Sequence, residues 1–449
     1  MTFNEITKII DLTDISDLEN ANNITNTNYF IKDYFFNNNS YKIIKYNKDK
    51  LKEFEKYDIE KFNHLSKFRS IIIKNNKLLV FSPEKSINFE NFKNKYINTE
   101  ECWLEDFIDG TMINVFFDTN NNEWEISTRS TVGGNILFFN DIKNYKYFDN
   151  KMDNINYNVT FRSMFFEACH VNNFDLNSLN TRYSYSFLMQ HPYNRIVTPV
   201  QTPLIFLIKI YEINNTEYPI VKITEKNIND FCNESPYIFL NTNIKFINKY
   251  PIQKSYDSIQ NDFDNNNVPY YCVGMVCYNI DGTRSKIRNN NYENVRKLRG
   301  NQPKLQFNYL CLKKENKIKE YLNYYPEHII IFNKFKLLVF SYTQDLYINY
   351  INCFIRKEKQ LKDYPFNFKI HMYNIHNIYI NKLKPEKKIV DKKVVIDYFN
   401  NLHPAQQMFI INNKFKNNNI QENMQEENMQ QENMQEENML EENMLEENM

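Results

Sequence analysis

Four segments that each read as strand, tight turn and strand constrain the fold of this chain more than any other feature. The segments are Ser70–Pro83, Met112–Ser130, Pro203–Ile223 and Tyr270–Arg288. Their turns contain Asn-rich or Asp-Gly steps, and such residues favour the tight connections of hairpins. Successive hairpins with few long helices between them predict an α+β fold with antiparallel sheets.

The pattern of apolar residues changes after about residue 301. From Leu310 to Leu383 apolar residues recur at helical spacing, and Asp391–Asn412 reads as a further helix that stops at His403-Pro404. We therefore expect a sheet-rich domain at 41–309 and a helical C-terminal domain at 310–415. Residues 1–40 are rich in Asn and weakly periodic, so we expect a loosely ordered start.

The end of the chain is an acidic repeat in which ENM recurs every five residues. Five residues advance a helix by about 140°, so the methionines form no single stripe. We expect 416–449 to be a disordered tail rather than a helix that binds a partner. No Lys or Arg occurs in 421–449, and without the ten Glu of that stretch the chain has 55 basic and 45 acidic residues. This balance suits a phosphate-rich partner, or it simply keeps the chain soluble.

Several features argue against a membrane or an oxidising compartment. The chain has no run of eighteen apolar residues and no basic, then apolar, leader at its start. Its seven cysteines are scattered without a C-x-x-C pair, and no histidine lies at zinc-ligand spacing beside them. We expect an intracellular, cytoplasmic protein with reduced thiols and no bound metal.

Glycine and arginine are scarce, and their positions are therefore informative. The chain has six glycines, and Asn, Lys, Ile and Tyr are abundant instead. Glycine is required where the backbone needs positive φ, and arginine where a forked phosphate contact is needed. The glycines and most arginines fall in or beside the segments described next.

Four short segments contain the residues with recognisable chemistry. They are FIDGTMINVFF (Phe107–Phe117) with TRS at Thr128–Ser130, FLMQHPYNRIVTP (Phe187–Pro199), VGMV (Val273–Val276) and SKIR (Ser285–Arg288). In this order they resemble the RNA-ligase branch of the covalent nucleotidyltransferases, in particular the phage-type tRNA-repair ligases. Together with the basic stretch from Arg296, they also resemble ligase-like proteins of large DNA viruses of amoebae.

The resemblance implies an antiparallel nucleotidyltransferase domain, ATP-grasp-like in its fold, that precedes the helical domain. Enzymes of this family join a lysine to a nucleotide and hold a divalent metal with two carboxylates. In this chain Phe107 occupies the position of the lysine, and Leu188 and Val273 occupy the positions of the carboxylates. Phenylalanine is not a nucleophile, and the aliphatic side chains offer Mg²⁺ no oxygen.

The remaining polar positions of these segments are candidates for binding. The candidates for phosphate or nucleotide are Asp109, Gly110, Arg129, Lys286 and Arg288, and those for nucleic acid are Arg195, Arg296, Lys297 and Arg299. Strand alternation would place Lys286 and Arg288 on one face. An alternative is that Asp109 forms a structural salt bridge with one of them.

Three functions follow as hypotheses. The first is a degenerate ligase-like protein that binds RNA, polynucleotide ends or nucleotide phosphate and needs no cofactor. The second is an active ATP-dependent RNA ligase with displaced catalytic residues, which would need ATP and Mg²⁺. The third is a structural viral protein, located in a viral factory or virion, that contacts protein partners through its helical domain.

Overall fold

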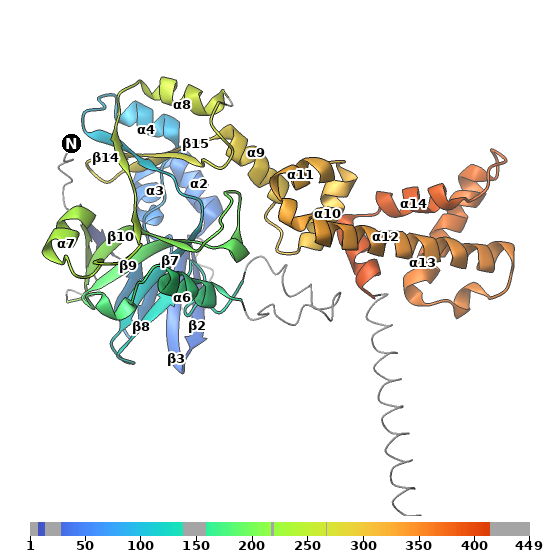
Figure 1. The fold of residues 1–449 in the computed structure, drawn as a ribbon, viewed down its shortest axis with the longest axis horizontal. Coiled ribbons are helices and arrows are strands. Elements are labelled where there is room, and N and C mark those ends of the chain that lie inside the picture. The colour runs from blue at the N-terminus through green and yellow to red at the C-terminus, as the bar shows by residue number, and fades with distance from the viewer. Residues whose placement is uncertain (1–7, 14–27, 138–158, 217–219, 266, 414–449) are drawn as a thin grey trace, which may run out of the picture. The chain divides into compact units, whose positions relative to one another are not determined.

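The chain forms two compact units, residues 1–301 and 302–449 (Figure 1). The computed structural model describes residues 8–13, 28–137, 159–216, 220–265 and 267–413. The first unit contains antiparallel sheets with helices on them, and the described part of the second unit is helical. The predicted α+β fold class is therefore confirmed. The boundary lies earlier than predicted, because helix α10 (Leu305–Lys314) packs with α12 (Ile329–Tyr350) through Tyr309 and Phe332.

The largest sheet provides one wall of the site described below. Its strands lie in the order β1 (Lys8–Leu12), β11 (Val221–Lys226), β10 (Leu204–Asn214), β9 (Tyr183–Gln190), β7 (Thr111–Asp118) and β8 (Glu123–Ser127), and β12 (Lys245–Phe246) also pairs with β10. Helix α6 (Phe161–Val171) contributes Phe165 and Ala168 to the core over this sheet. Inward side chains such as Ile113, Phe187 and Ile205 are fully buried there.

A smaller sheet provides the opposite wall. Its order is β13 (Lys249–Pro251), β6 (Cys102–Asp106), β14 (Gly274–Asn279) and β15 (Arg284–Arg288). Leu104, Cys277 and Ile287 point from one face into a core with α4 (Phe89–Lys95) and α8 (Tyr256–Asp264). Since side chains alternate between the two faces of a strand, the neighbouring residues on the other face remain available to a ligand.

A third sheet comprises β2 (Tyr29–Phe36), β3 (Asn39–Tyr46), β4 (Ile71–Lys74) and β5 (Lys77–Phe81), and α2 (Lys48–Tyr57) and α3 (Ile59–Ser66) pack against it. The predicted Asn-Asn turn is present, with φ of 50° at Asn75 and 58° at Asn76. Lys74 is bound to Asp118 of β7 at 2.7 Å, and the hydroxyl of Tyr41 donates to the same carboxylate at 2.6 Å. This buried cluster ties the third sheet to the largest one.

The start of the chain differs from the expectation of a loosely ordered 1–40. Residues 8–12 form β1 and residues 29–36 form β2. The partner of β1 is β11, in register from Lys8 opposite Glu225 to Leu12 opposite Val221. A partner so distant in sequence supplies the apolar contacts, so local periodicity gave no sign of this strand. The stretches 1–7 and 14–27 lie outside the described residues.

The second unit contains α10, α11 (Ile318–Tyr324), α12 (Ile329–Tyr350), α13 (Phe366–Ile378) and α14 (Lys392–Asn401). Helix α14 ends before His403, as the sequence predicts, and a new helix spans 404–413. The core of the second unit is aromatic: Tyr342 of α12 stacks on Phe368 of α13 with ring centroids 5.1 Å apart. None of the described helices combines the length and the apolar character that a membrane span requires. The predicted acidic tail lies outside the described residues.

Candidate functional site

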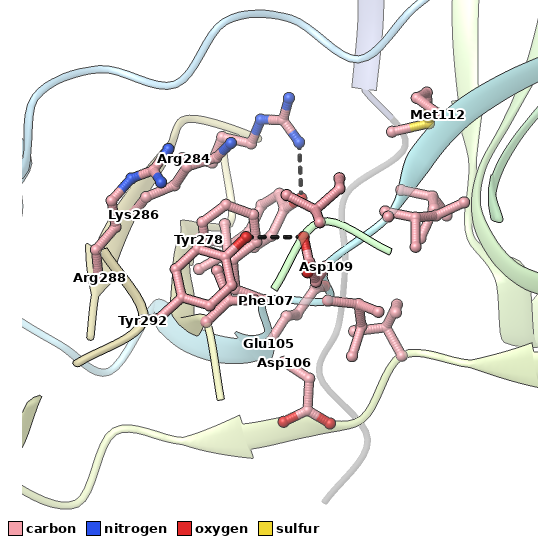
Figure 2. Close-up of a pocket in the computed structure, with 18 of the residues that line it drawn as sticks. Glu105, Asp106, Phe107, Asp109, Met112, Tyr278, Arg284, Lys286, Arg288 and Tyr292 are labelled. Carbon is pink, nitrogen blue, oxygen red and sulfur yellow. Dashed lines mark hydrogen bonds between the residues drawn. The ribbon is translucent and has the colours of Figure 1, made fainter. Parts of the chain in front are cut away.

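A cavity of about 300 Å³ lies in the first unit, between the free face of the smaller sheet and residues of β7, β9 and β10. The cavity is lined by Phe107, Leu188 and Val273, the three residues at the positions where the family resemblance implies a lysine and two carboxylates. Lys286 lines it as well, and it is the one lysine among the lining residues that the structure describes. Residues far apart in the sequence therefore share a single site (Figure 2).

Two glycines allow the backbone to take the shape of the cavity wall. Gly274 has φ of +135°, and a Cβ there would lie 2.0 Å from the carbonyl oxygen of Ile287 on the paired strand. Gly110 has φ of +155°, and a Cβ there would lie 2.5 Å from Cδ2 of Leu188. Because any larger residue would force the strands apart, both positions require glycine.

Strand β15 presents a row of cations to the cavity. Its burial alternates, so Arg284, Lys286 and Arg288 face one side while Ser285 and Ile287 are buried on the other. Figure 2 shows the three cationic side chains together, opposite the rings of the cavity wall. Two guanidinium groups and the amine of Lys286 therefore share one face of the strand, an arrangement that attracts anions.

The ring of Phe107 lies directly beside these cations. Nζ of Lys286 is 4.5 Å from its centroid, and Cζ of Arg288 is 5.3 Å away. Within the described part of the chain, the side-chain amine of Lys286 makes no hydrogen bond and no ion pair. The ring at position 107 therefore supports the cations through its π face and cannot act as a nucleophile.

The electrostatic environment of Lys286 is unusual for a lysine. Burial, followed by the positive charges of Arg284, Arg69, Arg288 and Lys85, lowers the pKa of Lys286 to about 6. At neutral pH the amine is consequently mostly unprotonated. An anion that binds to the surrounding arginines would offset part of their positive charge, while the burial that is the largest cause of the shift would remain.

Three carboxylates line the cavity, and each already has partners. Asp109 accepts hydrogen bonds from the backbone N–H of Val197 and of Thr198, both at 3.0 Å, and from the Tyr292 hydroxyl at 2.7 Å. The alternative that Asp109 pairs with Lys286 or Arg288 is therefore wrong. Its carboxylate faces the loop after β9 and helix α9 (Asn290–Arg299) instead.

Glu105 and Asp106 are the other two carboxylates. Nε1 of Trp103 donates to Glu105 at 3.0 Å, and Asn248 Nδ2 donates to Asp106 at 2.9 Å. Burial raises the pKa of Glu105, which reduces the negative charge that this side chain brings to the cavity. None of these three carboxylates forms an ion pair with Lys286, whereas Glu293 pairs with Arg288 and the charge of Glu225 acts on Arg284.

Not all of the predicted binding residues reach the cavity. Arg296 lines it, whereas Arg129 lies over the ring of Tyr46 with Cζ 5.1 Å from the centroid. Arg195 donates to the carbonyl of Val197 in its own loop at 3.1 Å. Lys297 is exposed on α9.

Arg299 requires a correction, because it is only 3% exposed. It lies at the C-terminal end of α9, where the chain packs its side chain inside. A nucleic-acid strand on the surface could not reach this guanidinium. Arg299 is therefore a structural residue, and the number of basic candidates on this helix falls to two, Arg296 and Lys297.

Two cationic residues of the cavity, Arg69 and Arg284, were not among the candidates. Arg284 precedes Lys286 by two residues, so strand alternation could have identified it. Arg69 lies between α3 and β4, in a segment without a motif, and no sequence signal points to it. Its guanidinium is held by the carbonyl of Pro83 at 3.4 Å, and burial lowers the pKa of Arg69 to about 10.

Comparisons with known proteins give likeness of fold alone. No protein-family model and no curated protein matches the chain. Among solved structures, the fold is similar to an archaeal ATP-dependent RNA ligase, with 10% identity over 69% of this chain and 67% of that chain and a TM-score of 0.31. It is also similar to a mutant of Naegleria gruberi RNA ligase with ATP and Mn, with 12% identity over 64% and 84% and a TM-score of 0.28.

Proposed function

We propose that the first unit binds the phosphate group of a polynucleotide end or nucleotide in this cavity, and forms no lysine–nucleotide bond at position 107. The observation that carries the proposal is Lys286, an amine that has no anionic partner among the described residues and is surrounded by Arg69, Arg284 and Arg288. A phosphate would supply the anionic partner that the Lys286 amine lacks among the described residues. Guanidinium groups suit it because their N–H donors match phosphate oxygens.

The apolar lining supports binding rather than metal-dependent catalysis. Leu188 is 9% exposed and Val273 is 4% exposed, and both stand where the resemblance places metal-binding carboxylates. Mg²⁺ requires oxygen ligands, and these two side chains provide none. Among the described residues, no cluster of three or more His, Cys, Asp or Glu side chains could hold a metal ion. The four sequence segments resemble RNA ligases, so an RNA end is the first ligand to test.

Binding of RNA that carries a terminal phosphate tests the proposal. We expect the full chain to bind a phosphorylated oligonucleotide at least about tenfold more tightly than the same strand with hydroxyl ends, since a charged hydrogen bond contributes about 1.5–3 kcal/mol. Lys286→Met should remove most of this preference, and Lys245→Met, at an exposed lysine, should not. Fluorescence anisotropy at two salt concentrations measures both effects. Equal affinity for phosphate and hydroxyl ends would contradict the proposal.

The variant Phe107→Lys tests the alternative of an active ligase. We expect Phe107→Lys to acquire no acid-labile label from [α-³²P]ATP with Mg²⁺ or Mn²⁺, because Leu188 and Val273 still provide no metal ligand. The unmodified chain serves as the comparison. Label on the unmodified chain would establish catalysis by displaced residues and would reject the binding-only function.

A further inference from the structure

The surroundings of Lys286 suit covalent chemistry that simple anion binding does not use. Its Nζ lies against the face of Phe107 in a cavity of about 300 Å³, with no hydrogen bond or ion pair from the described residues. Arg284 and Arg288 flank it on the same strand, and Arg69 lies nearby from the loop between α3 and β4. The cavity thus combines an unengaged amine with donors that could hold a phosphate beside it.

We propose that Lys286 forms an imine with an aldehyde that is carried next to a phosphate group. The inference rests on the proposed phosphate site, because the arginines must hold the phosphate while the amine reaches the carbonyl carbon. It assigns to the cavity a reactive residue different from position 107 and a ligand class different from intact nucleotides.

The reaction balances without an external oxidant or reductant. The lone pair of Nζ attacks the carbonyl carbon, and the C–N bond forms as the carbonyl oxygen takes a proton. The resulting carbinolamine then loses its hydroxyl as water, so the two amine protons and the carbonyl oxygen leave together. The product is a C=N bond, and water reverses it to amine and aldehyde.

The charges around Nζ favour the attacking form of the amine. The pKa of Lys286 is lowered to about 6, first by burial and then by Arg284, Arg69, Arg288 and Lys85. A desolvated lysine among cations is activated in this way for reaction with carbonyl compounds. The other ionisable groups that line the cavity are Glu105, Asp106, Asp109, Tyr278, Tyr292 and Arg296.

The lining also suits the product. A protonated imine is a cation, and the ring of Phe107 already lies 4.5 Å from the amine, so its π face can stabilise that charge. Val276 lies directly opposite Lys286 on β14, is 7% exposed, and adds an apolar side chain to the cavity wall. Aldehydes beside a phosphate occur in small sugar phosphates and at polynucleotide positions that have lost their base.

Reductive trapping tests the inference with the full chain at pH 6.5, where ordinary lysines are protonated. One arm uses glyceraldehyde 3-phosphate and another uses an oligonucleotide with an abasic site, each with cyanoborohydride, and peptide mapping locates the adduct. We expect Lys286 to be the main modified lysine. Glyceraldehyde without phosphate should react at least tenfold more slowly, and pyrophosphate should suppress the adduct. The more reactive arm identifies the source of the aldehyde.

Variants and competition separate the inference from the proposed function. Lys286→Arg should abolish the adduct, and Lys245→Arg should leave it unchanged. Adducts spread over exposed lysines, together with intact binding of phosphorylated RNA, would overturn the inference and leave the phosphate site standing. An adduct on Lys286 that needs no phosphate and is not suppressed by pyrophosphate would contradict the phosphate site, and with it the inference as stated. The mapping and the competition use the unmodified chain, so they do not depend on a variant that folds.

Discussion

Replacing Lys286 by methionine is expected to make the protein more stable at neutral pH, by about 2 kcal/mol in the free energy of unfolding. In the folded chain the pKa of Lys286 is about 6, whereas an unfolded lysine titrates near 10.4. Between these values the unfolded chain binds a proton that the folded chain does not, which favours unfolding. The figure allows for the partial exposure of the side chain, and methionine retains the apolar stem.

The stability gained by Lys286→Met should depend on pH. The penalty from Lys286 is complete at pH 6 and below, decreases as pH rises, and vanishes above the pKa of the unfolded lysine. The advantage of Lys286→Met should therefore be largest near pH 6 and absent near pH 10.5. Urea unfolding followed by the fluorescence of Trp103 and Trp124, both in the first unit, measures it. The exposed-site variant Lys245→Met is the control, and equal stability of Lys286→Met and the unmodified chain at all pH values would contradict the prediction.

Replacing Asp109 by alanine is expected to have the opposite and larger effect, a loss of about 4 kcal/mol. The carboxylate is 8% exposed and accepts hydrogen bonds from Val197, Thr198 and the hydroxyl of Tyr292. Alanine would leave the buried donors of Val197 and Tyr292, and the partly buried N–H of Thr198, without this acceptor. An unpaired buried donor lowers the free energy of unfolding by about 1–3 kcal/mol. The three donors here are neighbours, so their losses do not simply add.

Asp106→Ala is the matched control for Asp109. Asp106 also lines the cavity, but it accepts from the exposed groups of Asn248 and Tyr250, at 2.9 and 3.3 Å. Water can replace those bonds, so we expect a loss below about 1 kcal/mol. The urea midpoint of the first-unit transition compares the two variants. Similar losses for both would show that the Asp109 hydrogen bonds do not hold the site together.

The hairpins were predictable because their information is local. The pairs β4–β5 and β14–β15 each join strands a few residues apart, with turns at Asn75-Asn76 and Asp281-Gly282. Strand β1 was not predictable, because its partner lies more than two hundred residues later in the chain. Local patterns cannot show which distant segment will cover an apolar face.

The candidate site was also predictable in part. Motif order and strand alternation identified Phe107, Leu188, Val273, Lys286 and Arg288, which the fold brings to one cavity. The partners of Asp109 were not predictable, because two of them are backbone N–H groups whose position depends on the loop after β9. Arg69 was missed because it reaches the cavity from a loop without a motif.

The hydrogen bonds of Asp109 divide the cavity residues into two groups with different tolerance to mutation. Asp109 joins the turn after β6, the loop at 197–198 and helix α9, so a change there must be compensated in three places. Phe107, Leu188 and Val273 hold no buried donor with their side chains and can change one at a time. A lineage that carries this fold can therefore alter what the cavity accepts without first rebuilding the framework around it, and ligand preference should diverge faster than architecture.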